Sequence, residues 1–128
     1  MLRHAISFLR KVPGGEYAFE IIVNLTINQS YEINHKGTLL RFSIPNRLTK
    51  FRAESFSTKE PETLDWIDSI PENSTLWDIG ANVGIYTCYS VIARNCRVFA
   101  FEPSVFNLEC LARNINNNNI VKYVTIIP

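Results

Sequence analysis

The middle of the chain reads Thr75-Leu76-Trp77-Asp78-Ile79-Gly80-Ala81-Asn82-Val83-Gly84-Ile85-Tyr86. An apolar run containing one acid comes first, and a turn bounded by two glycines follows it. Glycine permits the sharp bend between a strand and a helix, and it lets a ligand approach the backbone closely. The stretch therefore predicts a strand over 75–79, a glycine-rich turn, and a helix over 85–93.

The same alternation continues downstream. A strand is predicted over 97–101, a helix over 104–115, and a strand over 123–127 after an asparagine-rich turn. Strands that alternate with helices are typical of a parallel sheet with helices packed on it. The sequence therefore predicts an α/β fold.

The residues upstream of this unit form shorter patterns. Residues 1–12 predict a short amphipathic helix that Pro13 ends, and residues 19–27 fit either a strand or a helix. Two extended runs around Asn34-His35-Lys36-Gly37 predict a β-hairpin, with His35 exposed in its turn. A further helix is expected to begin within 58–63, capped by a hydroxyl residue.

These patterns divide the chain into two parts. We expect an amino-terminal extension with the β-hairpin at 1–56 and an incomplete cofactor-binding α/β domain at 57–128. The 128 residues are 46% hydrophobic and 20% charged, which is typical of a globular chain with one core. No run of 18 apolar residues occurs, so we expect no membrane partner.

Charge and cysteine content narrow the function classes. Residues 1–53 carry a net charge of +5 and residues 54–128 a net charge of −4, but the basic residues are scattered, so we expect no nucleic-acid partner. The three cysteines, Cys88, Cys96 and Cys110, show no C-x-x-C spacing, and the two histidines lie far from them. We therefore expect no metal site, and reduced thiols in a cytoplasmic protein.

Two acids end neighbouring strands of the predicted sheet. Asp78 directly precedes the glycine-rich turn, and Glu102 follows the next strand, where a carboxylate can accept hydrogen bonds from ribose hydroxyls. Glycines after one strand and an acid after the next predict a site for an adenosine-containing cofactor.

The cofactor is expected to be S-adenosylmethionine. The dinucleotide fingerprint G-x-G-x-x-G would place glycine where Asn82 stands, and the Asn82 side chain would crowd a pyrophosphate. Asp78 would also repel that pyrophosphate, whereas it could face the cationic amine and sulfonium of S-adenosylmethionine. A nicotinamide-dependent oxidoreductase remains the alternative.

Several motifs resemble the FkbM family of methyltransferases, over roughly residues 35–128. They are Thr58 to Leu64, Trp77 to Tyr86 with its D-I-G-A-N-x-G element, Phe99 to Ser104 with its A-F-E-P element, and Asn107 to Asn114. The resemblance implies a class I methyltransferase (Rossmann-like) fold and methyl transfer from S-adenosylmethionine to an oxygen, often a sugar or polyketide hydroxyl.

The resemblance also implies roles for individual residues. Asp78, Gly80, Ala81, Asn82 and Gly84 would hold the methionine and ribose part of the cofactor. Glu102 would bind the ribose hydroxyls, and Pro103 with Ser104 would border the adenine. We add the hypothesis that Glu60 or Thr63 reaches the methionine end. Tyr86 could touch the cofactor, and no catalytic base is assigned.

The predicted sheet is half of a class I sheet. The strand over 75–79 would be central in that fold, yet here it would keep an open edge. We therefore expect the amino-terminal part of a longer or truncated enzyme, acting on a small-molecule or glycan acceptor and inactive as the 128-residue chain alone. A non-catalytic remnant that self-associates through the open sheet edge is a further alternative.

Overall fold

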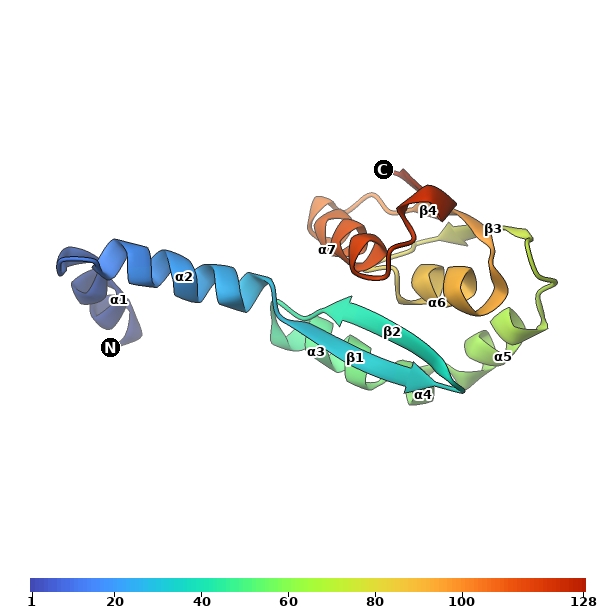
Figure 1. Ribbon diagram of the computed structural model, residues 1–128, viewed down its shortest axis with the longest axis horizontal. Helices are drawn as coiled ribbons and strands as arrows, with labels where there is room; N and C mark the ends of the chain where they lie inside the picture. The colour runs from blue at the N-terminus through green and yellow to red at the C-terminus, as the bar shows by residue number, and fades with distance from the viewer.

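The computed structural model describes residues 1–128, apart from the side chain of Leu2. Its elements, in chain order, are α1 (Leu2–Lys11), α2 (Gly15–Ile27), β1 (Ser30–His35), β2 (Thr38–Ser43), α3 (Arg47–Glu54), α4 (Phe56–Lys59), α5 (Pro61–Ser69), β3 (Thr75–Ile79), α6 (Ile85–Arg94), β4 (Arg97–Phe101), α7 (Val105–Asn117), the 3-10 helix η1 (Val121–Tyr123) and β5 (Val124–Ile127). Figure 1 shows their arrangement.

Two sheets lie on opposite sides of a helical layer. Strands β3, β4 and β5 form a parallel sheet in that order, with Asp78 opposite Ala100. Strands β1 and β2 form an antiparallel hairpin. Helices α6 and α7 lie between the sheet and the hairpin, as Figure 1 shows. The α/β fold and the β-hairpin are confirmed.

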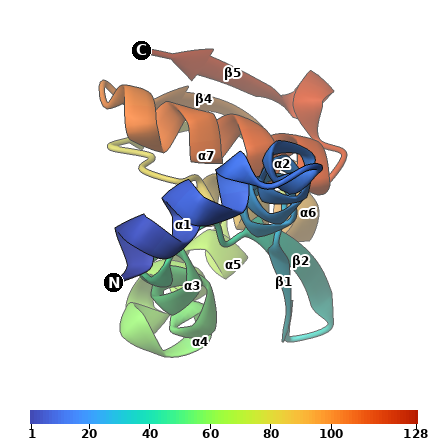
Figure 2. The same cartoon turned by 90° about the vertical axis from the view of Figure 1, so that its left-hand side faces the viewer.

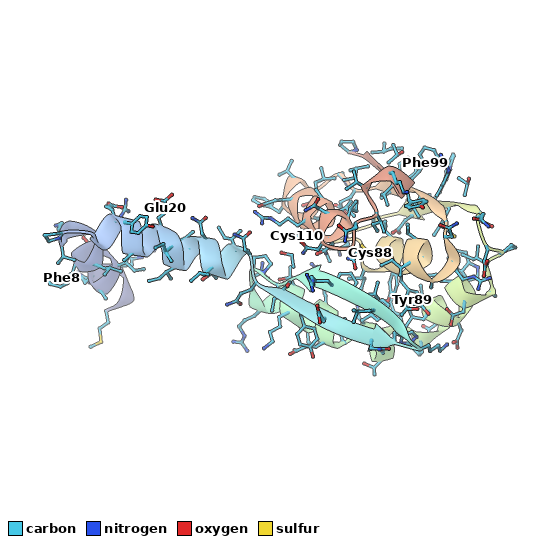
Figure 3. The ribbon with its side chains drawn as sticks, in the orientation of Figure 1. Phe8, Glu20, Cys88, Tyr89, Phe99 and Cys110 are labelled. Atoms are coloured by element: carbon cyan, nitrogen blue, oxygen red, sulfur yellow. The ribbon has the colours of Figure 1, made fainter. Side chains whose placement is uncertain are left out.

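The core forms where these layers meet. Helix α6 is buried on two sides, because the sheet contacts one face and strand β2 contacts another. Leu40 and Phe42 of β2 are fully buried against this layer, together with Phe56 of α4. Cys88 lies within the same layer in Figure 3. Burial of these side chains fixes the hairpin and α4 over the start of α6.

Two asparagines of the α7 region attach the hairpin by hydrogen bonds. The Asn114 side chain is 1% exposed; its oxygen accepts from the Ser43 N–H and its nitrogen donates to the Val83 carbonyl, both at 2.7 Å. The Asn118 side chain pairs with the N–H and carbonyl of Arg41 at 2.9 and 2.8 Å. Asn114 thus ties the hairpin directly to the glycine-rich turn.

Helices α1 and α2 project from this body in Figure 1, and in Figure 2, which is viewed from that end, they lie in front of it. They pack on each other and leave apolar side chains in solvent, including Phe8, labelled in Figure 3 and 71% exposed, and Tyr17. Residues 19–27, ambiguous in sequence, are helical here. Within the described part of the chain, no helix combines the length and apolar character needed to cross a bilayer.

The parallel sheet has one open edge and one bare face. Strand β3 pairs only with β4, as predicted. Helices α6 and α7 cover one face in Figure 1. Burial alternates along β3, so Trp77 and Ile79, which are 66% and 78% exposed, lie on the other face. Parallel sheets are normally covered on both faces, so this face is a surface for further packing.

The region between the hairpin and β3 differs from expectation. Residues 47–59 form two helices, α3 and α4, that the sequence analysis did not predict. The expected hydroxyl cap at the start of α5 is wrong: Thr58 lies inside α4, and Glu60 occupies the cap position without a side-chain cap bond. Pro61 at the first helical position supplies the start signal instead. The division at 56/57 stays a prediction.

Candidate functional site

The turn between β3 and α6 is held in a compact form by backbone hydrogen bonds. The N–H groups of Gly80 and Ala81 both donate to the Phe101 carbonyl at 2.9 Å. Gly80, Asn82 and Gly84 all have positive φ angles, of 79°, 55° and 78°. Glycine and asparagine tolerate this left-handed conformation best, so the G-A-N-x-G sequence is what the turn requires.

The two glycines of the turn have different surroundings. A Cβ placed on Gly80 would meet no atom within 4 Å, and Gly80 lines a cavity. A Cβ on Gly84 would lie 2.3 Å from Leu111 Cδ1, and Leu111 is fully buried. Gly80 therefore keeps open space for a ligand, whereas Gly84 permits close packing of α7 on the turn.

Glu102 joins the ends of the two strands. Its carboxylate is 6% exposed and accepts hydrogen bonds from the N–H groups of Asn82 and Ser104, each at 2.8 Å. These bonds, with the Ser104 N–H as the largest cause, lower the pKa of Glu102. Each carboxylate oxygen has two acceptor sites, so an ionised Glu102 can still accept from ligand hydroxyls.

Asp78 lies at the carboxyl end of β3 and lines the cavity. One carboxylate oxygen accepts a hydrogen bond from the Thr87 hydroxyl on α6. Burial raises the pKa of Asp78, although the Thr87 bond partly opposes that rise. No cationic group of the described residues forms an ion pair with Asp78, so its charge is directed at the cavity without compensation.

The cavity has a volume of about 180 Å³ and opens above the glycine-rich turn. Its walls come from α3, α4, the β3–α6 turn and the first turn of α6, and are lined by Arg52, Phe56, Lys59, Glu60, Asp78, Gly80, Ala81, Asn82, Val83, Ile85 and Tyr86. The volume is below the roughly 300–1,000 Å³ typical of complete ligand sites. It suits one end of a larger ligand.

Two buried oxygens in this cavity lack hydrogen-bond partners. They are Asn82 Oδ1 and the Tyr86 hydroxyl. Burial raises the pKa of Tyr86, and the nearby Glu60 charge adds to the rise. Because a buried polar atom without a partner is costly, both oxygens are ready to bond a polar ligand.

The structure brings together some of the sequence-predicted site residues. Asp78, Gly80, Ala81 and Asn82 line the cavity, and Glu102 adjoins it through its bond to Asn82. Gly84, Pro103 and Ser104 lie outside the lining, as does Thr63, whereas Glu60 and Tyr86 are part of it. These positions do not test ligand binding, so the assigned roles stay predictions.

Arg52 and Phe56 are cavity residues that the sequence analysis missed. Arg52 lies on α3 and Phe56 on α4. Helix α3 begins with a capping box in which Asn46 and Thr49 exchange hydrogen bonds. Asn46 follows the proline that closes the hairpin, so a capping residue was visible in the sequence. No ligand-binding motif accompanies it.

The prediction that His35 is exposed is wrong. His35 ends β1, and its Nδ1 lies 2.8 Å from Ser57 Oγ. Its ring packs edge-on against Phe56 and Tyr89, and its Nε2 is buried without a partner. The hairpin turn consists of Lys36 and Gly37 alone. His35 is therefore the last residue of strand β1, and its side chain lies on the inward face of the hairpin. It supports the Phe56 wall of the cavity from behind.

The cysteines and potential metal ligands show no further site. Cys88, Cys96 and Cys110 are free and buried. Burial raises the pKa of all three thiols, which leaves them protonated at neutral pH. Among the residues whose side chains are described, no three histidine, cysteine or acidic groups gather as a metal site would require.

Comparison with known proteins places the fold. No protein-family model matches the chain. The hexuronic acid methyltransferase AglP of Haloferax volcanii is 26% identical over 78 residues, covering 61% of this chain and 32% of AglP. The structure of M. jannaschii TYW2 in complex with AdoMet matches 78% of this chain and 43% of that chain, with a TM-score of 0.55 and 18% identity. The structure of P. horikoshii TYW2 in complex with MeSAdo matches 78% of this chain and 36% of that chain, with a TM-score of 0.56 and 13% identity.

In each of these comparisons the chain matches only part of the other protein. The chain spans 32% of the curated methyltransferase that it resembles and less than half of each structural neighbour. It has the α/β fold of part of a class I methyltransferase, and its sequence is homologous to a methyltransferase.

Proposed function

We propose that the chain is the cofactor-binding part of an S-adenosylmethionine-dependent methyltransferase of the FkbM type, within a longer enzyme. The observation that carries the proposal is the cavity above the β3–α6 turn, where Asp78 directs an uncompensated negative charge inward. A sulfonium cofactor supplies an electrophilic methyl group, and its positive charge complements that carboxylate.

The residues present fit this cofactor. Gly80 leaves open space beside the backbone, and the buried Asn82 oxygen lacks a partner. Glu102 is held ionised beside the turn, with acceptor sites left for ribose hydroxyls. Asp78 would face the amine and sulfonium, and Pro103 with Ser104 would border the adenine.

The same features argue against a dinucleotide. Asn82 stands at the centre of the turn with its side-chain oxygen buried in the cavity wall. A pyrophosphate pressed on this turn would meet an acceptor oxygen at Asn82 and a carboxylate at Asp78, and both would repel its charge. We therefore rank a nicotinamide-dependent oxidoreductase second.

We further propose that the acceptor is a hydroxyl oxygen of a sugar or secondary metabolite. AglP is a hexuronic acid methyltransferase, and the homology over the matched 78 residues supports a sugar acceptor. No side chain is assigned as catalytic base, because the cavity residues bind and orient the cofactor end. The chain's own residues thus hold the donor, and the acceptor groups belong to the longer enzyme.

The test is transfer of labelled methyl by the full-length enzyme. Methyl-labelled S-adenosylmethionine is incubated with the enzyme and with glycans that contain or lack a hexuronic acid. Label in an alkali-stable ether of a sugar would support the proposal. Label only in protein or nucleic acid, or no binding of the cofactor, would overturn it.

We also propose a cellular compartment for the protein and a surface through which it self-associates. The three buried free thiols support a reducing, cytoplasmic compartment. The unpaired edge of β3 and the exposed Trp77 and Ile79 support self-association whenever no other segment covers them. A non-catalytic remnant would show this association without cofactor binding.

A further inference from the structure

Arg52 lines the cavity but belongs to neither the glycine-rich motif nor the A-F-E-P motif of the sequence. It extends from α3, in the segment before the α/β unit, and its side chain is half-buried at the cavity wall. No ion pair or hydrogen bond joins its guanidinium to the side chains that the structure describes. Such a group is a ready donor of two parallel hydrogen bonds to a carboxylate.

Two of the charged residues that line the cavity, Arg52 and Asp78, form no ion pair within the described part of the chain. Lys59 and Glu60 form an ion pair at 3.2 Å, so they largely neutralise each other. Asp78 is bonded to the neutral Thr87 and forms no ion pair with a described side chain, and Arg52 forms none either, although its charge also helps to lower the pKa of Glu102 beside the turn. The cavity thus presents Arg52 and Asp78 as separate opposite charges within about 180 Å³.

A zwitterion is the ligand that complements this pair. An α-amino acid end group carries a carboxylate and an ammonium on one carbon. The ammonium has three donors, and the cavity offers Asp78, the unpartnered Asn82 Oδ1 and the unpartnered Tyr86 hydroxyl oxygen as acceptors. Among the described charged groups that line the cavity, Arg52 is the cation without an ion-pair partner, and its guanidinium can hold a carboxylate with two parallel hydrogen bonds, whereas the Asn82 amide and the Tyr86 hydroxyl offer single neutral donors.

We propose that Arg52 binds the carboxylate of a zwitterionic amino-acid end group while Asp78, Asn82 and Tyr86 bind its ammonium. This assignment rests on the proposed function, because it makes the amino-acid end of the cofactor the occupant. It also gives residues 47–54, outside the predicted cofactor-binding domain, a direct part in selecting the ligand.

The test compares two ligands that differ in one group. S-adenosylmethionine carries the carboxylate, and decarboxylated S-adenosylmethionine keeps the ammonium and sulfonium but lacks it. Binding is measured by calorimetry on the full-length enzyme. Arg52→Gln is expected to weaken S-adenosylmethionine about tenfold or more, and to change the affinity for the decarboxylated ligand less than twofold.

Two variants control for charge and folding. Arg47→Gln removes the same type of side chain from the exposed start of α3, and is expected to bind both ligands as the wild type does. Arg52→Lys keeps the charge but loses the two-pronged donor geometry, so an intermediate loss confined to S-adenosylmethionine is expected. Far-ultraviolet circular dichroism checks that each variant is folded.

Each outcome decides the matter. Equal losses for both ligands, or no loss in Arg52→Gln, would overturn the role of Arg52 while leaving the proposed function intact. A wild-type enzyme that binds neither ligand would overturn the proposed function and this inference together.

Discussion

The backbone N–H of Asn82 donates a hydrogen bond of 2.8 Å to the Glu102 carboxylate. This bond links the turn after β3 to the end of β4, which lie 20 positions apart in sequence. Since Asn82 has a φ of 55°, the bond also stabilises a conformation that non-glycine residues adopt reluctantly. The bond therefore helps to fix the shape of the turn that lines the cavity.

Replacement of this carboxylate tests its two roles. Glu102→Gln is expected to lower the free energy of unfolding by about 1–2 kcal/mol, because one of two N–H groups loses its acceptor. The folded-state pKa of Glu102 is lowered from 4.5, so its stabilisation is present above pH 4.5 and is lost as pH falls through the folded value. Urea unfolding between pH 3 and 7 measures both effects.

In that series the variant should show a weaker acid dependence than the wild type. A wild-type protein whose stability stayed flat below pH 4.5, or a variant equal to it at every pH, would show that Glu102 is not held ionised by the turn.

Replacement of Asp78 should weaken ligand binding without lowering the stability of the fold. Burial raises the pKa of Asp78 above 3.8, so the folded state favours the neutral, protonated carboxyl; this contribution to stability is present below pH 3.8 and is lost as pH rises through the folded pKa. Asp78→Asn removes this cost while keeping an oxygen for the Thr87 hydroxyl. We expect unchanged or slightly higher thermal stability at pH 7, together with at least a tenfold loss of S-adenosylmethionine affinity. A stability loss without an affinity loss would contradict the account.

The two glycines of the turn should respond differently to alanine. Gly84→Ala places a methyl group against the buried Leu111 and strains a positive φ, so a loss of about 2 kcal/mol or more is expected. Gly80→Ala strains φ alone, for about 1 kcal/mol, but fills space in the cavity and should weaken cofactor binding. Denaturation and calorimetry on the two variants compare these losses. Equal stability losses would contradict the separation of roles.

Asn114 should be one of the costliest polar residues to replace. Asn114→Ala leaves the Ser43 N–H and the Val83 carbonyl buried without partners, so about 2–4 kcal/mol of stability should be lost. Asn116→Ala on the same helix is the matched control, since Asn116 is exposed. Chemical denaturation of both variants compares them, and similar midpoints would show that the hairpin does not depend on this bridge.

Much of the α/β unit followed from local sequence, because strong alternation and glycine turns act within a few residues. The bounds of β3 and β4 match the predicted 75–79 and 97–101. Helices α3 and α4 were missed, since their short, polar sequences are held mainly by contacts of Ala53 and Phe56 with the distant core. The cavity position of Arg52 and the burial of His35 were missed for the same reason, because both depend on contacts with residues that are distant in sequence.

Self-association is expected where the sheet stays uncovered. The 128-residue chain should sediment with a mass above 14.7 kDa that rises with concentration, and Trp77→Lys should shift it toward the monomer. Sedimentation velocity measures this. Strictly monomeric behaviour at high concentration would argue against pairing through β3.

The most direct test of the central claim is competition between two cofactors for the full-length enzyme. Calorimetric titration with S-adenosylmethionine is repeated in excess NAD. The account predicts saturable binding of S-adenosylmethionine that NAD leaves unchanged. Displacement by NAD, or the absence of S-adenosylmethionine binding in a folded enzyme, would contradict it.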